Sequence, residues 1–284
     1  CAYSQLGDVA KGDELVDGAK AHLDAQLTPY DAMLINHVFM ARRCFELDDR
    51  NHAVKFAGWA TEAVGKLERL SWYNKANPQI VELLAVLVQL GDADAIDALS
   101  EAMTTSMGAD WVLGQALIAE ALWKVGEEDR AGEMLDKLVP AEDNIEELAF
   151  VGHANAVVGR KDVARTQIDA ALEILRSDGE RLYYYREEIS AGYVRLGDIE
   201  RGKAAMNNPE RWGATLVREG RYDEAMDCEN DCPRFPGNFD LSLALAHMGR
   251  YEEAVEWART VSGRRPFMYI ALATAYRLEH SADE

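Results

Sequence analysis

Apolar residues recur at helical spacing along most of the chain, and short polar turns interrupt them at regular intervals. Ala and Leu are frequent in these stretches, and no run alternates apolar and polar residues between hairpin turns. Both features predict an all-α protein. The expected helices span residues 9–24, 30–47, 51–70, 78–90, 93–107, 110–125, 128–139, 144–158, 161–176, 180–196, 199–206, 209–219, 222–230, 238–248, 251–262 and 266–279.

A glycine turn separates paired helices in six places: Leu90-Gly91-Asp92, Val125-Gly126-Glu127, Val158-Gly159-Arg160, Leu196-Gly197-Asp198, Glu219-Gly220-Arg221 and Met248-Gly249-Arg250. The six glycines lie 35, 33, 38, 23 and 29 residues apart. Glycine suits the left-handed cap of a helix, and the seven prolines fall where the pattern needs breaks. Repetition at this period is typical of a helical solenoid, in which each unit packs only on its neighbours.

The N-terminal part of the chain and the last helix depart from this pattern. Asp48-Asp49-Arg50-Asn51 stands where a glycine turn is expected. Leu6-Gly7-Asp8 resembles a turn, which suggests that the chain opens on the second helix of a pair. The helix at 266–279 has no partner, and we expect it to act as a cap.

Small residues occupy two fixed places in the repeated unit. Seven residues before the turn glycine stand Ala119, Gly152, Ser190, Gly213 and Ser242, with Leu84 as the exception. Five residues after it stand Ala131, Ala164, Gly202, Ala225 and Ala254, with Ile96 as the exception. Small side chains at these places allow paired helices to approach closely.

Two segments resemble the tetratricopeptide repeat family, namely 249–258 (GRYEEAVEWA) and 220–225 (GRYDEA). The resemblance covers residues 78–279 well and 1–77 weakly. It implies a right-handed α-solenoid of about seven to eight helix-turn-helix repeats. We therefore expect degenerate repeats over 1–77 that continue into regular repeats over 78–284, although the units of 23 and 29 residues are short for the family.

The same resemblance implies a binding face, because the first helix of each pair lines the concave groove in that family. Counting back from each turn glycine gives the expected groove residues Glu120, Trp123, Lys124, His153, Tyr184, Glu187, Arg195, Arg218 and His247. Trp and Arg often anchor binding hot spots, which favours Trp123, Arg195 and Arg218. Packing of Trp123 between helices is an equal alternative.

Charge narrows the choice of partner. The net charge of −20 disfavours nucleic acid and anionic membrane surfaces. It suits a basic protein or peptide partner, although solubility alone also explains it. The expected groove has no set of Lys and Asn residues like the clamp with which the family captures acidic peptide tails. We therefore expect a scaffold or adaptor that binds a protein or peptide and serves as a subunit or assembly factor of a larger complex.

The cysteines do not identify the cellular compartment of the protein. The sequence begins at Cys1, which fits a lipidated mature terminus on a bacterial envelope, a chain that lost its Met, or a trimmed chain. A lipid on Cys1 is the one route to a membrane that we expect, and the alternative is a cytoplasmic protein. Cys44 is expected to be buried, and Cys228 and Cys232 could form a local disulfide or remain reduced.

No motif predicts a catalytic residue, a cofactor or a metal site. The segment 197–204 (GDIERGKA) nearly matches a phosphate-binding loop, but Ala204 replaces the required hydroxyl and a helix precedes it. The segment 227–231 (DCEND) lacks the glycine and glutamate of a calcium loop. An enzyme on a helical-repeat frame, with a pocket built from Glu120, His153 and Glu187, remains an alternative.

Overall fold

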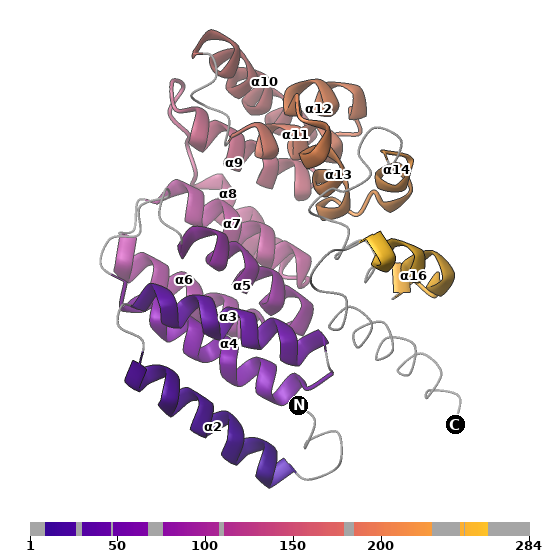
Figure 1. The fold of residues 1–284 in the computed structure, drawn as a ribbon. Helices are drawn as coiled ribbons and strands as arrows, with labels where there is room; N and C mark the ends of the chain where they lie inside the picture. Colours follow the sequence, from indigo (N-terminus) through magenta and orange to yellow (C-terminus); the bar gives the residue numbers. More distant parts are fainter. Residues whose placement is uncertain are drawn as a thin grey trace. The chain divides into compact units, whose positions relative to one another are not determined.

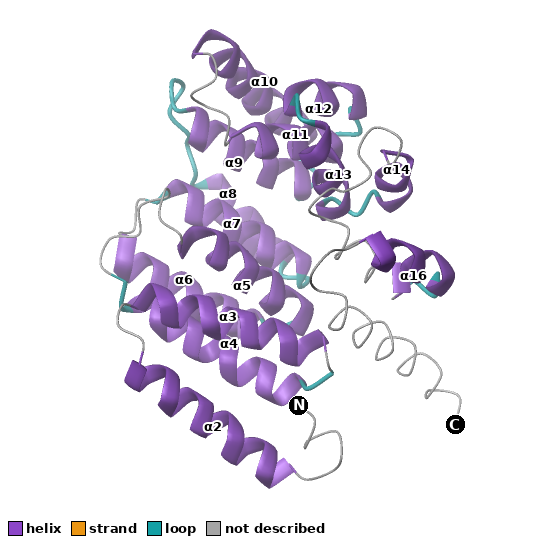
Figure 2. Ribbon diagram, viewed as in Figure 1, coloured by secondary structure: helices purple, strands orange, loops and turns teal. Residues whose placement is uncertain are grey.

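The structure is a computed structural model that describes residues 9–26, 30–46, 48–67, 76–107, 111–178, 185–228, 245–246 and 248–260. Within these residues the regular structure is helical, with fourteen α-helices and no strand (Figure 1; Figure 2). The predicted all-α class is therefore confirmed.

The helices follow the predicted order. They are α2 (Val9–Gln26), α3 (Tyr30–Glu46), α4 (Arg50–Gly65), α5 (Ala76–Leu90), α6 (Ala93–Met107), α7 (Val112–Lys124), α8 (Glu128–Asp136), α9 (Ile145–Val157), α10 (Lys161–Asp178), α11 (Arg186–Arg195), α12 (Ile199–Met206), α13 (Pro209–Arg218), α14 (Tyr222–Asp227) and α16 (Tyr251–Thr260). Most limits agree with the prediction within three residues. The predicted helix 266–279, most of 238–248 and the start of 180–196 lie outside the described residues.

Three predicted helices extend at least three residues too far at their carboxyl ends, and the one predicted to reach residue 139 ends at Asp136. The helix predicted to reach residue 70 ends at Gly65, because the backbone N–H of Lys66 turns back to the carbonyls of Ala63 and Val64. The helix predicted to reach residue 230 ends at Asp227, where the N–H of Cys228 donates to the carbonyls of Ala225 and Met226. Neither of these last two turns uses a left-handed glycine of the kind that closes the helix pairs, because Gly65 is the last helical residue of α4 and Cys228 has negative φ.

The chain divides into two compact units, Cys1–Leu138 (unit 1) and Val139–Glu284 (unit 2). In unit 1, α3 packs on α4 and on α5, α4 packs on α6, and α5 packs on α7 (Figure 1). Helices α3, α4 and α5 thus each contact their pair partner and the equivalent helix of the next pair. Leu34, Phe56, Leu83, Ile96 and Leu122 are among the side chains of one continuous core.

Unit 2 repeats this arrangement. α9 packs on α10 and α11, α11 packs on α12 and α13, and α13 packs on α14. The first helices of three successive pairs, α9, α11 and α13, therefore form one row. Ile168, Ile189, Tyr193 and Leu216 are fully buried in this unit.

The six turn glycines share one conformation, as the sequence predicts. Their φ angles range from +69° at Gly91 to +91° at Gly126. At Gly197 the N–H donates to Val194 and the next N–H donates to Tyr193, which is a Schellman cap. Asp48 adopts the same conformation, with φ of +58°, in the one pair that lacks the glycine.

The small residues lie where paired helices approach each other. Ala131, Ala164 and Ala225 are fully buried. A Cβ added to Gly152 would lie 2.8 Å from Ile168 Cγ1, and one added to Gly202 would lie 3.1 Å from the carbonyl oxygen of Ser190. A larger side chain at these two positions would push the helices apart.

The left-handed turns predict opposite effects of two substitutions. Asp48→Gly should raise the free energy of unfolding by on the order of 0.5 kcal/mol, because Asp pays a steric cost at positive φ that Gly does not. Gly197→Ala should lower it by about 1 kcal/mol for the same reason, since no atom lies close enough to obstruct the added methyl group. Urea denaturation measures both changes in the free energy of unfolding. If both substitutions stabilised the fold, or both destabilised it, the role given to positive φ would be contradicted.

Candidate functional site

A group of charged side chains lies between the first helices of unit 2, and two of its members, His153 and Glu219, are buried. We call it the charge cluster, and it consists of His153, Glu188, Arg195, Arg218 and Glu219. His153 belongs to α9, Glu188 and Arg195 belong to α11, and Arg218 and Glu219 stand at the end of α13. The cluster thus connects all three helices of the row.

His153 lies between the two carboxylates of the cluster. Its Nδ1 is 3.2 Å from Glu188 Oε2, and its Nε2 is 3.3 Å from Glu219 Oε1. The second contact is poorly aligned for a hydrogen bond and is best described as a charge contact. The His153 side chain is 5% exposed and that of Glu219 is 2% exposed, so water contributes little to solvating either group.

Two guanidinium groups complete the pairing. Arg218 donates from Nη1 to Glu188 Oε1 over 2.7 Å and from Nη2 to Oε2 over 3.2 Å. Its Nε donates to Glu219 Oε1 over 3.0 Å. Arg195 Nε donates to the other oxygen of Glu219. Both carboxylates therefore accept charged donors, while about a third of each arginine side chain remains exposed.

The arginines and the histidine keep both glutamates ionised. Burial raises the pKa of Glu188, but Arg218 and His153 outweigh this effect and lower the pKa to about 2. Burial likewise opposes ionisation of Glu219, whereas His153, Arg218 and Arg195 bring its pKa well below the usual range. Neither carboxyl group is therefore protonated at neutral pH.

The groove prediction selected three of these five residues. His153, Arg195 and Arg218 were expected on one face, and the structure brings them together through Glu188 and Glu219. Glu187, also predicted, forms a separate ion pair with Arg211 of α13. The sequence analysis missed Glu188 and Glu219. Glu219 could have been found, because the residue before the turn glycine is Leu, Val or Met in the other five turns.

The remaining predicted groove residues lie elsewhere or outside the described residues. Glu120 and Lys124 form an ion pair along α7 of unit 1. Trp123 is partly buried against the core of unit 1, an arrangement that agrees with packing between helices. Tyr184 and His247 are not among the described residues, and neither is Cys1.

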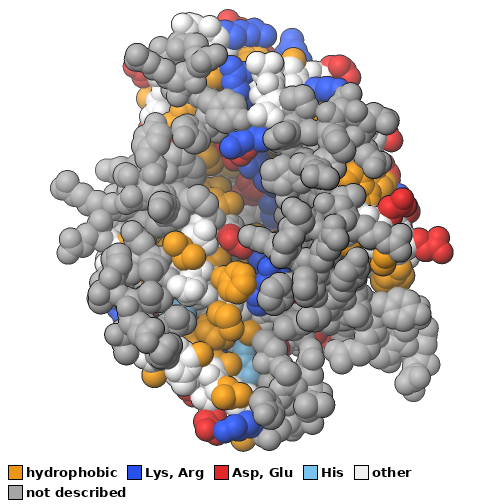
Figure 3. All heavy atoms as spheres, in the orientation of Figure 1, with side chains coloured by type: hydrophobic (Ala, Val, Ile, Leu, Met, Phe, Trp, Pro, Cys, Tyr) orange, Lys and Arg blue, Asp and Glu red, His pale blue; other side chains and the backbone are white. Residues whose placement is uncertain are grey.

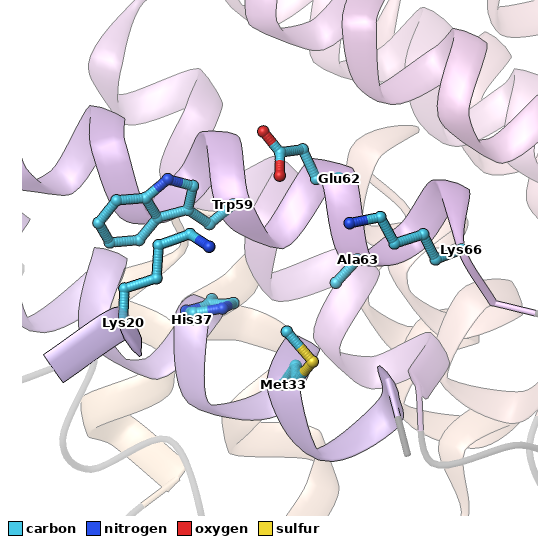
Figure 4. Close-up of a pocket in the computed structure, with 7 residues that line it drawn as sticks. All are labelled: Lys20, Met33, His37, Trp59, Glu62, Ala63 and Lys66. Carbon is cyan, nitrogen blue, oxygen red and sulfur yellow. The ribbon is translucent and has the colours of Figure 1, made fainter. Parts of the chain in front are cut away.

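Unit 1 has a small pocket that the sequence analysis did not predict (Figure 4). It has a volume of about 40 Å³ and is lined by Lys20, Met33, His37, Trp59, Glu62, Ala63 and Lys66. The Lys20 ammonium lies 5.3 Å from the centre of the Trp59 ring, a cation–π contact. This volume can hold a water molecule but not a drug-sized ligand.

On the face shown in Figure 3, Lys and Arg side chains lie beside Asp and Glu side chains in the upper part of the view, and hydrophobic side chains gather in the lower centre. Among the described residues, no group of His, Cys, Asp and Glu is arranged to hold a metal ion. No described helix has the length and apolar character needed to cross a membrane.

Cys44 is fully buried, as the sequence predicts. Burial and the nearby Asp49 raise the pKa of its thiol to about 12. Because the thiolate is the reactive form, Cys44 is not a nucleophile at neutral pH. Cys228 is also buried, and Cys232 lies outside the described residues, so their pairing stays a prediction.

Comparison with known proteins gives no assignment. No family model matches the chain, and no curated protein shows a significant match.

The buried carboxylate of Glu219 should be more important for stability than the exposed one of Glu187. Glu219→Gln removes the charge that pairs with two arginines and His153, and should lower the free energy of unfolding by on the order of 3 kcal/mol. Glu187→Gln, the matched control on the same face, should change it by less than about 1 kcal/mol. Denaturant unfolding of the two variants compares them, and equal losses would contradict the role given to burial.

Acid should weaken unit 2 through Glu188. Its pKa is about 2 in the folded chain and about 4.3 in an unfolded chain. The folded state therefore binds fewer protons, so this stabilisation is complete above about pH 4.3 and is lost as pH falls toward about 2. Unfolding of the wild type and of Glu188→Gln between pH 6 and pH 3 should converge as pH falls; parallel curves would contradict this.

Proposed function

We propose that this chain is a non-catalytic scaffold or adaptor, built as a tetratricopeptide-like α-solenoid, that binds a protein or peptide. The row of first helices in unit 2, α9, α11 and α13, is the observation that supports this proposal most directly. A continuous row of helices offers one extended face, which is how repeat proteins bind their partners.

The repeated turn supports the solenoid. Five pairs of described helices close with a glycine at positive φ, a sixth closes with Asp48 in the same conformation, and Gly249 before α16 also has positive φ. In each unit the helices contact pair partners and neighbouring pairs. Such nearest-neighbour packing needs no central core, and the tetratricopeptide family is the architecture that the sequence resembles.

The arginines of the row are suited to binding. Arg195, Arg211 and Arg218 each pair with a carboxylate, yet each side chain remains 33–40% exposed. A guanidinium that is already held in place loses less side-chain entropy when a partner binds. Arg is also enriched among residues that dominate binding energy. We therefore place the partner contact on this face.

The net charge of the chain favours a partner of opposite charge. The three arginines of the face are balanced by Glu187, Glu188 and Glu219, so the net charge of −20 belongs to the rest of the chain. This field attracts a basic protein and repels nucleic acid.

The enzyme alternative has less support. It needs the side chains of Glu120, His153 and Glu187 to converge in a pocket. Within unit 2, His153 faces Glu188 and Glu219, whereas Glu187 pairs with Arg211. A general base needs a ring nitrogen within reach of a substrate, and both nitrogens of His153 face protein carboxylates.

Capture experiments with matched variants test the binding face. The full chain is tagged, incubated with an extract of its source cells, and its bound proteins are quantified by mass spectrometry. Arg211→Ala and Arg195→Lys alter the face but keep the buried charge of Glu219 paired. At least one partner should fall at least about tenfold with these variants, because a hot-spot arginine contributes about 1.4 kcal/mol or more.

Arg201→Ala is the control. Arg201 lies on α12, a second helix, and its ion pairs with Asp169 and Asp198 are exposed. This variant should recover the same partners as the wild type. Equal recovery by all variants would exclude the proposed face as the site of binding.

A further inference from the structure

His153 lies between two buried or nearly buried carboxylates, an environment that favours the positively charged form of its ring. A neutral ring has one N–H donor and one bare nitrogen with a lone pair. Both ring nitrogens of His153 lie within 3.3 Å of a carboxylate oxygen. Glu188 and Glu219 are both ionised and have no proton to donate, so a bare nitrogen would face a negative oxygen.

The doubly protonated ring suits this environment, although the contact of Nε2 with Glu219 is one of charge and not an aligned hydrogen bond. An imidazolium ion has an N–H on each nitrogen and a positive charge that both carboxylates attract. Burial opposes this charge, since the side chain is 5% exposed. Two direct carboxylate contacts oppose that cost.

The groups around His153 come from each helix that packs on α9. From α11 these are Glu188 and, beyond it, Arg195; from the end of α13 they are Glu219 and Arg218. On α10 the side chains that approach α9 near this position are neutral. Gln167 bonds Asn155, and Ile168 packs beside Gly152 and Gly192.

The charged residues of α10 pair away from this site. Arg165 pairs with Asp198, and Asp169 accepts from Tyr193 and Arg201. The two guanidinium groups of the charge cluster are thus the described positive charges near His153, and each already pairs with a carboxylate of the cluster.

We propose that His153 is a proton-dependent link between α9, α11 and α13: the folded chain holds the ring doubly protonated, and loss of one proton loosens the row. The sign follows from proton binding. Above about pH 6.5 an unfolded histidine has lost its extra proton while the folded one retains it. The folded state then binds more protons, so stability falls as pH rises.

The inference does not depend on the identity of any partner. It assigns to the binding face of the proposed scaffold a control by pH, with the row tighter in mildly acidic solution and looser in alkaline solution. A second histidine, His52 of unit 1, lies near Asp49 and Asp13. Asp13 is 42% exposed and also pairs with Lys55, so this arrangement is less enclosed than that of His153.

Nuclear magnetic resonance of the full wild-type chain tests the protonation state directly. With histidine labelled by ¹⁵N, the ring nitrogens of His153 are assigned by comparison with His153→Gln. We expect both nitrogens to show the imidazolium signature at pH 7.5, one pH unit above the midpoint of an unfolded histidine. A neutral ring at pH 7.5 would overturn the proposal.

Hydrogen exchange of backbone amides tests the link between the helices. As pH rises from 6 to 9, the protection of α9, α11 and α13 should fall by up to tenfold per pH unit, after correction for the intrinsic exchange rate. Helices α5 and α6 of unit 1, which contain no histidine, are the internal control. In His153→Gln, whose side chain does not titrate, the protection ratio of the two regions should be independent of pH.

Two results would contradict the link. One is protection of α9, α11 and α13 that does not change with pH in the wild type. The other is the same pH dependence in His153→Gln, which would assign the effect to another group. Electrostatic repulsion within this acidic chain also grows with pH. It acts alike on the wild type and on His153→Gln, so it cancels when the two are compared.

Discussion

The architecture depends on one local constraint, the left-handed residue that closes each helix pair. A single amphipathic helix cannot bury its apolar face alone, so its neighbour must return close beside it. A residue at positive φ ends the first helix within one turn and reverses the chain. Small residues such as Ala131 and Gly202 then allow the helix axes to approach, and a buried layer forms between pairs. Contacts with the next pair follow from this geometry, because each pair still exposes one apolar side.

This constraint explains why most helices could be predicted from the sequence. Helical periodicity and turn glycines are local signals, and Gly197 has the same meaning in the sequence as in the structure. The errors occur where the signal is absent. Helix α4 ends at Gly65, but the segment 66–70 (KLERL) consists of good helix formers and continues the pattern. At Asp48 the sequence showed an irregular turn without showing that Asp would adopt the glycine conformation.

The site was less predictable because its contacts join helices that are distant in the sequence. Offsets from the turn glycines selected His153, Arg195 and Arg218, since equivalent positions of successive repeats share a face. The offsets could not show that Glu188 and Glu219 lie between them, because that depends on the spacing of α9, α11 and α13 in three dimensions. The pocket beside Trp59 was missed for another reason. It belongs to the part of the chain where the repeat pattern is weakest, so no offset could be counted.

The charge cluster of unit 2 does more than hold the row of helices together. Apolar side chains of similar volume could replace such a cluster with equal or greater stability, because charged groups are costly to remove from water. Stability alone therefore does not account for it. A carboxylate buried at Glu219 fixes the positions of Arg195 and Arg218, whose remaining surface faces solvent. An apolar core would hold the same helices together but would leave any surface arginine free to move. The cluster thus connects the packing of the helices to the placement of the groups that a partner can contact.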